Sequence, residues 1–252
     1  MDFHINNHTI AVNVPTWAAL EARVAERLAQ RKGFALATIN LDHLVKLKNS
    51  NTFCEAYAAQ DFVVADGNPI VWISRLAGRP VSLVPGSEAI LPLARIAARQ
   101  GVGLGLFGST QPVLQAAKAY LEREVRDLKV VSCIAPPMGF DPHSEDAKAL
   151  LQEMQDDGVG LCFIALGAPK QEMLAAQGRE TVPSMGFVSI GAGLDFFAGK
   201  QKRAPVWVRR IAMEWLWRML GNPRRLVGRY MQCFAILPGQ MMRALKLRLR
   251  RA

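Results

Sequence analysis

The sequence predicts an α/β protein in which a mainly parallel sheet is flanked by helices and followed by a basic helical C-terminal appendage. Two observations predict this fold. Over residues 1–199, short apolar runs alternate with segments of helical periodicity, as in sheets built from parallel strands and crossover helices. From Lys200 to Ala252, every charged residue except Glu214 is basic, and Trp, Met, Leu and Ile lie among them. The 14 basic residues and one acidic residue of this segment give it a net charge of +13, so the whole-chain charge of +10 leaves residues 1–199 at about −3.

Six apolar runs are the predicted strands, because each is short and is followed by a turn or a helix-like segment. They cover residues 34–41, 62–65, 102–107, 130–135, 161–166 and 187–190. Helices are predicted where apolar residues recur every three or four positions, over residues 16–31, 88–100, 112–126 and 144–156. Ser109 or Thr110 would cap the third of these helices, and Ser144 the fourth. This alternation predicts a Rossmann-like α/β domain over residues 1–199 and a helical appendage over residues 200–252.

The composition argues against several classes of protein. The four cysteines lie far apart without CxxC spacing, so we expect reduced, buried thiols and no structural zinc; they are Cys54, Cys133, Cys162 and Cys233. No apolar run reaches the roughly 18 residues that would span a bilayer. The polar segment 1–14 is unlike a secretory signal. We therefore expect a cytoplasmic protein that at most lies on a membrane surface.

Five predicted strands end in polar or glycine-bearing turns. In open α/β sheets, ligands lie outside the carboxyl ends of the strands, where backbone N–H groups and helix N-termini face phosphate. The turns are Thr38-Ile39-Asn40, Asp66-Gly67-Asn68-Pro69, Phe107-Gly108-Ser109, Leu166-Gly167-Ala168-Pro169 and Ile190-Gly191-Ala192-Gly193. We expect a nucleotide-type ligand at this edge. The alternative is that the glycines only end the strands.

Gly103, Gly105 and Gly108 match the GxGxxG pattern of dinucleotide-binding proteins. The first two lie inside the apolar run rather than in the turn after it, and the next strand is not followed by the expected acidic residue. We therefore do not interpret the match as a dehydrogenase motif. Gly108 and Ser109 stay candidates for contact with phosphate.

Asp66 is the best candidate for a general base, because it follows a buried strand and precedes Gly67 at the lip of the sheet. The alternative is that Asp66 forms an Asx turn or caps the following helix. Thr38 and Asn40 end the preceding strand. They are candidates for hydrogen bonds to a diphosphate or a sugar, and turn formation is the alternative.

Lys170, Gln171 and Glu172 directly follow the turn at Gly167. Lys170 would neutralise a phosphate, and Gln171 would bind a sugar or a leaving group. The alternative is the polar first turn of a surface helix.

Gly191, Gly193 and Asp195 follow the last predicted strand. Asp195 would accept a hydrogen bond from a base or a ribose hydroxyl, or would only stabilise the turn.

Several catalytic motifs are missing from the sequence. There is no DxD triplet, GxxxxGK[ST], HExxH or GxSxG, and His4, His8, His43 and His143 form no cluster. Metal catalysis and serine hydrolysis are therefore disfavoured, and we expect neither a metal nor a cofactor.

In combination, these segments make the chain resemble the WecG/TagA/CpsF family of glycosyltransferases (glycosyltransferase family 26) over nearly its whole length. The matching pieces, in chain order, are Thr38-Ile39-Asn40, Ala65-Asp66-Gly67-Asn68-Pro69, Pro85-Gly86-Ser87-Glu88, Phe107-Gly108-Ser109, Leu166-Gly167-Ala168-Pro169-Lys170-Gln171-Glu172, Gly191-Ala192-Gly193-Leu194-Asp195, Arg203-Ala204-Pro205, Glu214-Trp215-Leu216-Trp217-Arg218 and Asn222-Pro223-Arg224-Arg225. Each segment alone is weak evidence for the family, but the order and combination of the segments are specific to it.

The resemblance implies an inverting, metal-independent transfer of a hexose or N-acetylhexosamine from a UDP-sugar to a polyprenyl-diphosphate-linked sugar, in surface or exported polysaccharide biosynthesis. The donor sugar it favours is N-acetylmannosamine, with glucose as the alternative. It makes Asp66 the proposed base, places Thr38 and Gln171 in the active site, and gives the appendage a role in closing that site and meeting the membrane. The family's Arg is missing from residues 82–88. Arg79 or an appendage arginine would replace it.

Without a metal, the charge on the departing UDP must be compensated by cationic side chains and backbone N–H groups. The candidate cations in the appendage are Arg203, Arg218, Arg224 and Arg225.

The appendage is predicted to form three helices, over residues 206–220, over residues 224–236, and after Pro238-Gly239. In the first, Val206, Ile211, Trp215 and Leu216 share one face. Basic amphipathic helices with aromatic residues bind anionic membrane surfaces. A helical lid packed on the sheet and a contact within a homo-oligomer are the alternatives.

Two other classes of function compete with a glycosyltransferase. A nucleotide-dependent oxidoreductase is disfavoured by the misplaced glycines, and a non-catalytic basic protein would bind nucleic acid or membrane. Neither a helix-turn-helix nor an aromatic-bearing sheet face is visible. We therefore expect no nucleic-acid partner.

Overall fold

A computed structural model of the chain describes residues 1–197, 199, 204–205, 207–208 and 212–249. Its core is a six-stranded sheet in the order β4-β3-β8-β7-β5-β6, with every neighbouring pair parallel. The strands are β3 (Phe34–Ile39), β4 (Phe62–Ala65), β5 (Gly103–Gly108), β6 (Val130–Ile134), β7 (Val159–Ala165) and β8 (Gly186–Ser189). The predicted parallel α/β sheet is confirmed.

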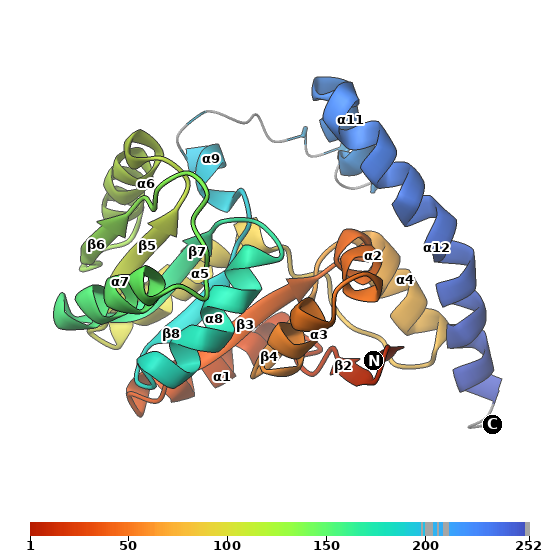
Figure 1. The fold of residues 1–252 in the computed structure, drawn as a ribbon, viewed down its shortest axis with the longest axis horizontal. Helices are drawn as coiled ribbons and strands as arrows, with labels where there is room; N and C mark the ends of the chain where they lie inside the picture. The colour runs from red at the N-terminus through yellow and green to blue at the C-terminus, as the bar shows by residue number, and fades with distance from the viewer. Residues whose placement is uncertain (198, 200–203, 206, 209–211, 250–252) are drawn as a thin grey trace.

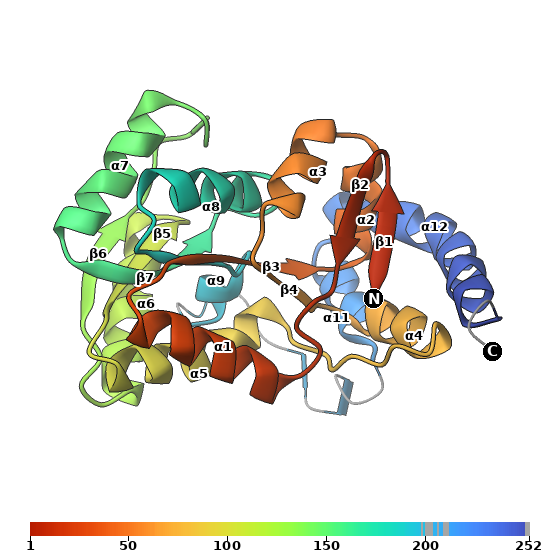
Figure 2. The same cartoon turned by 90° about the horizontal axis from the view of Figure 1, so that it is seen from below.

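Helices cover both faces of the sheet (Figure 1). Figure 2 separates the two layers. One layer contains α1 (Trp17–Ala29), α5 (Gly86–Arg99), α6 (Gln111–Glu124) and α9 (Gly193–Phe197). The other contains α2 (Leu41–Lys48), α3 (Asn51–Ala58), α7 (Glu145–Asp156) and α8 (Lys170–Thr181). Each layer buries an apolar face against the sheet, because strands buried on both sides need two covers.

The predicted helix caps are confirmed in part. Ser144 accepts a hydrogen bond from Ala147 N at 3.1 Å and so caps α7. Thr110 occupies the N-cap position of α6, but its side chain makes no capping hydrogen bond. Ser109 is not the N-cap residue, because Thr110 holds that position; its hydroxyl donates to Asp195 Oδ1 at 3.4 Å.

An N-terminal hairpin was not predicted from the sequence. It consists of β1 (Asp2–Ile5) and β2 (His8–Ala11), which pair antiparallel. Its apolar side chains pack with α2, α3 and α4 (Asn68–Leu76) in a cluster at one end of the molecule. The alternation Phe3, Ile5, then Ile10, Val12 around Asn6-Asn7 was the signal for this hairpin.

The appendage forms α11 (Glu214–Gly221) and α12 (Pro223–Leu249) in its described part. The predicted break at Gly221-Asn222-Pro223 is confirmed. The predicted second break was wrong, because α12 continues through Pro238. Val206 and Ile211, expected on the first helix, lie outside the described residues.

Packing explains the continuity of α12. It lies against α2 and α4 and buries Cys233, Gln240 and Ala244 (Figure 1). A proline inside a helix costs about 3 kcal/mol. Burial of an apolar face offsets a cost of that size, at about 25 cal/mol per Å².

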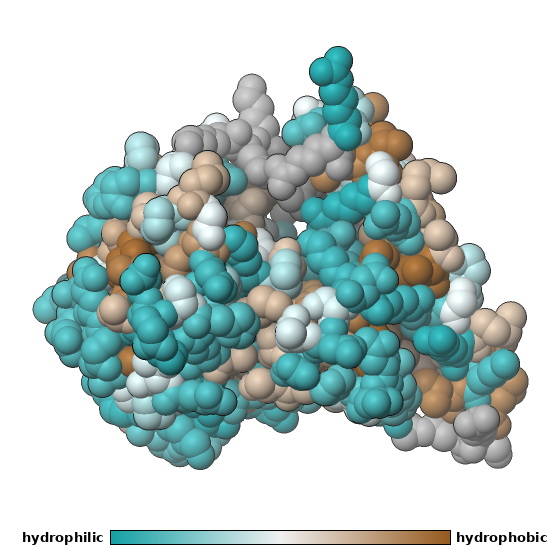
Figure 3. All heavy atoms as spheres, viewed as in Figure 1, coloured by the Kyte–Doolittle hydropathy of each residue, from teal (hydrophilic) through white to brown (hydrophobic). Residues whose placement is uncertain are grey.

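The opposite side of α12 remains exposed, and apolar side chains appear along it in the space-filling view (Figure 3). Val227, Met231, Met241, Met242 and Leu249 are all exposed there. Within the described residues, no helix is both long and apolar enough to cross a membrane.

Candidate active site

The sheet register brings the predicted turns together at one edge. Thr38 lies opposite Val64, and Ile39 lies opposite Ala65. Ile164 lies opposite Ser189 in the same way. Since all six strands run in one direction, the residues that follow them share the carboxyl edge of the sheet. That edge is the candidate active site.

Asp66 extends the pairing of β4 beyond its last residue. Its backbone N–H donates to Ile39 O at 2.8 Å, so Asp66 lies beside the end of β3. The N-cap of α4 is Gly67, which has φ +95° and makes no side-chain capping bond. Asp66 therefore does not occupy the N-cap position, and its half-buried side chain lies at the lip of the sheet.

Thr38 and Asn40 are held by a buried network. Tyr57 donates its hydroxyl hydrogen to Thr38 O at 3.0 Å, and His43 Nδ1 lies 2.7 Å from the same hydroxyl. Burial lowers the pKa of His43 to about 3, so the ring is neutral. Because the Tyr57 hydroxyl hydrogen goes to Thr38 O, Nδ1 of His43 is the donor in its contact with Tyr57. Asn40 Oδ1 accepts from His43 N at 3.0 Å and caps α2. This cap supports the turn-forming alternative for Asn40.

Gln171 joins two strand ends. Its Oε1 accepts from Gly191 N at 2.9 Å, and its Nε2 donates to Glu172 Oε1 at 2.7 Å. Gln171 and Glu172 are both buried. Gly191 has φ +57°, a left-handed conformation that suits glycine, so the Gln171 amide stabilises an otherwise open turn after β8.

Glu172 is a fully buried carboxyl group with one poorly satisfied oxygen. Oε2 has no hydrogen-bond partner among the described residues. Desolvation raises the pKa of Glu172 to about 7, and the hydrogen bond from Gln171 partly opposes this shift. Because it is buried behind Gln171, Glu172 can act on a ligand only through its neighbour.

The turn after β5 contacts α9, which lies in the same helix layer as α6. Gly108 has φ +107°, and a Cβ there would lie 2.6 Å from Ala165 O, so only glycine fits. Ser109 follows it and donates to Asp195 Oδ1 at 3.4 Å. Gly103 and Gly105 lie inside β5, where they allow close packing against Gly158 and Val159. The two glycines therefore serve strand packing, in agreement with the prediction that they are not a dehydrogenase motif.

Two lysines bind backbone carbonyls near the site. Lys170 donates from Nζ to Phe140 O at 2.6 Å, which directs it to the loop before α7. Lys46, which the sequence analysis missed, donates to Ala168 O at 3.1 Å. Gly167 lies in the turn that contains Ala168, whereas Gly193 begins α9 and Asn68 begins α4.

The predicted arginines are described only in part. Arg203 lies outside the described residues, as do the side chains of Arg218 and Arg225. Arg224 is exposed in the first turn of α12. The structure adds Arg229, whose Nε lies 2.9 Å from Asp42 Oδ1. Asp42 and Lys46 have i,i+4 spacing after the Asn40 cap, but no sequence signal connected them with Arg229.

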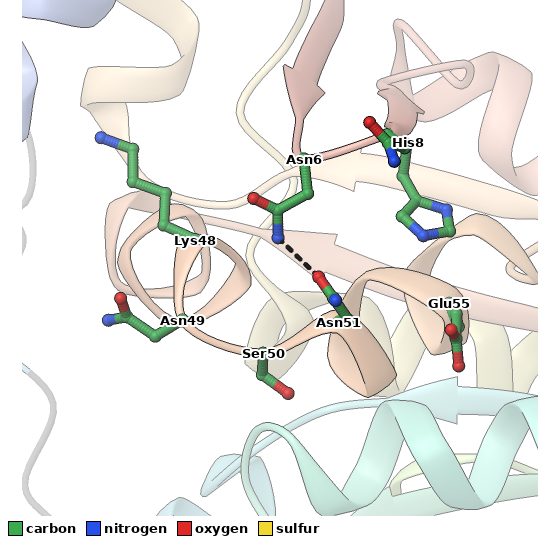
Figure 4. Close-up of a pocket in the computed structure, with 8 residues that line it drawn as sticks. Asn6, His8, Lys48, Asn49, Ser50, Asn51 and Glu55 are labelled. Atoms are coloured by element: carbon green, nitrogen blue, oxygen red, sulfur yellow. Dashed lines mark hydrogen bonds between the residues drawn. The ribbon is translucent and has the colours of Figure 1, made fainter.

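Two hollows lie beside this region. One of about 550 Å³ lies between α2 and α12. The other, of about 710 Å³, is lined by polar side chains at the far end of α2, where Asn6 Nδ2 donates to Asn51 Oδ1 (Figure 4). Only the first adjoins the strand ends, through Pro169. Within the described part of the chain, no three His, Cys, Asp or Glu residues form a metal site.

Two comparisons with known proteins both find similarity to glycosyltransferases. The model of the family described as "Glycosyl transferase WecG/TagA/CpsF family" matches residues 5–252. The chain is also 25% identical over 198 residues to the N-acetylglucosaminyldiphosphoundecaprenol N-acetyl-beta-D-mannosaminyltransferase of Bacillus subtilis (strain 168). That match covers 78% of this chain and 75% of the relative.

The raised pKa of Glu172 predicts a pH-dependent stability. Below pH 4.5, both the folded and the unfolded chain carry the proton, so the contribution of Glu172 is fully present. As pH rises through 7, that contribution is lost. We expect Glu172→Gln, which cannot ionise, to gain on the order of 3 kcal/mol relative to wild type between pH 4.5 and 8.

Urea unfolding of both proteins at several pH values measures this difference. Glu180→Gln, an exposed position on the same helix, is the control and should show a flat difference. A flat difference for Glu172→Gln as well would show that Glu172 ionises normally in the folded protein.

Proposed function

The chain belongs to the WecG/TagA/CpsF family and is a glycosyltransferase, and we propose that it transfers a hexose or N-acetylhexosamine from a UDP-sugar to a polyprenyl-diphosphate-linked sugar. The acceptor class is supported by the Bacillus subtilis relative, whose name specifies N-acetylglucosaminyldiphosphoundecaprenol. The same name favours N-acetylmannosamine as the transferred sugar, with glucose as the alternative. Family membership removes the oxidoreductase and the non-catalytic binding protein from consideration.

The observation that carries this proposal is the convergence of Asp66, Thr38 and Gln171 at one sheet edge. In the proposed mechanism, an acceptor hydroxyl attacks the anomeric carbon from the side opposite UDP. The hydroxyl proton passes to the Asp66 carboxylate as the new bond forms. The bond from the anomeric carbon to the UDP oxygen breaks, and the negative charge leaves with UDP. This single displacement inverts the anomeric configuration.

The remaining predicted residues divide between the two substrates. The UDP moiety would bind at the carboxyl ends of β5, β7 and β8. The residues that would contact it there are Gly108, Ser109, Gly167 and Asp195. Lys170 and the arginines Arg203, Arg218, Arg224 and Arg225 would compensate the charge of the leaving group without a metal. Gly191 and Gly193 shape the intervening turn, and Gly67 and Asn68 shape the turn after Asp66. Glu172 is a positioning residue behind Gln171.

The exposed side of α12 fits an anionic membrane surface. Val227, Met231, Met242 and Leu249 are exposed there, and Arg224, Arg243 and Lys246 are exposed on the same helix. Apolar and basic side chains on one helix bind anionic interfaces, at about 1 kcal/mol for each basic residue. Since the other side packs on α2 and α4, the helix acts as a lid and as a membrane contact together. We propose that the enzyme works at the cytoplasmic face of the membrane.

The first experiment measures UDP release from a panel of UDP-sugars, with and without a short prenyl-diphosphate-linked sugar, in the presence of EDTA. We expect release from one donor that depends on the acceptor and is insensitive to EDTA. Loss of the activity in EDTA, restored by a divalent cation, would contradict the metal-independent mechanism. Absence of release from any donor by folded protein supplied with vesicles would contradict the proposed reaction.

Asp66→Asn should lower turnover by roughly 10²- to 10⁴-fold, the scale of lost general-base catalysis. UDP affinity should change little, because the carboxylate acts on the acceptor. Turnover and UDP titration test the two effects separately. Asp157→Asn, an exposed change at the end of α7, is the control. Near-normal turnover of Asp66→Asn would remove Asp66 from the mechanism.

Met231→Ser combined with Met242→Ser should weaken binding to anionic vesicles about tenfold or more. The two side chains are 63% and 57% exposed, and burying a Met side chain is worth about 1.5–3 kcal/mol. Co-sedimentation with vesicles measures the effect, and Met138→Ser, at an exposed methionine away from the appendage, is the control. Equal sedimentation of all three proteins would place the membrane contact elsewhere.

A further inference from the structure

The cavity between α2 and α12 is lined by both cationic and apolar side chains. Lys46 and Arg229 contribute cations on one side, and both lie 2.9 Å from the carboxylate of Asp42. Val45 and Leu226 contribute apolar surface. Its volume of about 550 Å³ lies in the range of roughly 300–1,000 Å³ typical of small-molecule sites.

We propose that this cavity binds the diphosphate of the lipid-linked acceptor, together with the first isoprenoid units attached to it. This inference rests on the proposed function, because it assigns the acceptor of that reaction to a place. The diphosphate would lie against Lys46 and Arg229, and the isoprenoid chain against Val45, Leu226 and Phe53.

Charge favours an anion in this position. One carboxylate between two cations leaves the cluster with an excess positive charge, and both cations are still partly exposed, at 38% for Lys46 and 40% for Arg229. The guanidinium carries five donors, and it directs Nε at Asp42. The ammonium has three donors, two of which are directed at Asp42 and Ala168 O. Both groups therefore retain donors for phosphate oxygens.

The location of the cavity favours the acceptor over the donor. Helix α2 begins directly after β3, the strand that neighbours β4 and Asp66. Lys46 also donates to Ala168 O in the turn between β7 and Gln171, so the cavity adjoins the active-site edge of the sheet. A diphosphate held here leaves its attached sugar near the base that must deprotonate it. The phosphate-type turns at Gly108 and Gly191 lie farther along the sheet, on the opposite side of β3.

The apolar lining of the cavity favours a lipid ligand over a nucleotide. Leu226 belongs to α12, the helix whose outer side exposes Met231 and Met242. An isoprenoid chain that leaves a bilayer beside α12 would meet Leu226 of the same helix in the cavity. A uridine diphosphate offers no apolar tail to fill it.

The test titrates the full-length protein with farnesyl diphosphate, inorganic pyrophosphate and UDP by calorimetry. For farnesyl diphosphate, we expect Lys46→Met and Arg229→Met each to weaken binding at least tenfold, with UDP binding unchanged. Lys48→Met is the matched control, because it removes a cation from the same helix at the rim of the other hollow. It should leave both ligands unaffected.

Asp42→Asn decides between an anion site and a simple docking contact. If the cations serve a diphosphate, removing the competing carboxylate should tighten farnesyl diphosphate binding several-fold. If the Asp42 to Arg229 pair only holds α12 in place, Asp42→Asn should weaken binding as much as Arg229→Met does, and the proposal fails. Lys46→Met leaves that pair intact, so its loss of affinity cannot come from displacement of α12.

The remaining outcomes are also distinguishable. Equal losses for UDP and farnesyl diphosphate would assign the cavity to the donor and overturn the proposal. Normal transfer with an unchanged acceptor KM in Lys46→Met and Arg229→Met would overturn it while leaving the proposed function in place. A wild-type enzyme that binds UDP, yet neither binds farnesyl diphosphate nor transfers to any prenyl-linked sugar, would overturn both.

Discussion

Parallel hydrogen bonding of β3 to β4 on one side and to β8 on the other determines where the candidate site lies. Because the strands run in one direction, the residues that leave them emerge at the same edge. Asp66 and Gly191 are far apart in sequence, yet each follows a direct neighbour of β3. The extra hydrogen bond from Asp66 N to Ile39 O continues this pairing beyond the last strand residue. The position of the proposed base is thus a consequence of strand register.

Buried polar side chains then hold the turns at that edge. The Tyr57 hydroxyl binds Thr38 O, and the Gln171 amide binds Gly191 N. Leaving such a buried group without a partner costs about 1–3 kcal/mol, so each bond restricts the turn that it reaches. Glu172 continues the second network into the interior, where burial favours its neutral form. The turns can therefore present backbone groups to a ligand without being loose.

Helix α12 connects this edge with the outside of the molecule. Its inner face packs through Cys233 and Ala244 into the cluster formed by α2, α4 and the hairpin. Its first turns supply Arg229 to Asp42. Its outer face is apolar and basic. One continuous helix would thus give the proposed lid, the proposed acceptor cavity and the proposed membrane contact a common rigid support, which two helices broken at Pro238 would not do.

The sequence by itself determined the parallel α/β sheet, the ends of most strands, and the edge at which polar turns would gather, because alternation and turn residues are local signals. The tertiary structure decided which of these turn residues are already engaged: Asn40 caps α2, Gln171 binds Gly191, and Glu172 is buried. It also decided that α12 continues through Pro238 and that Arg229 meets Asp42. Such contacts join residues far apart in the chain, and packing energy rather than local propensity selects them, so no pattern within one segment could reveal them.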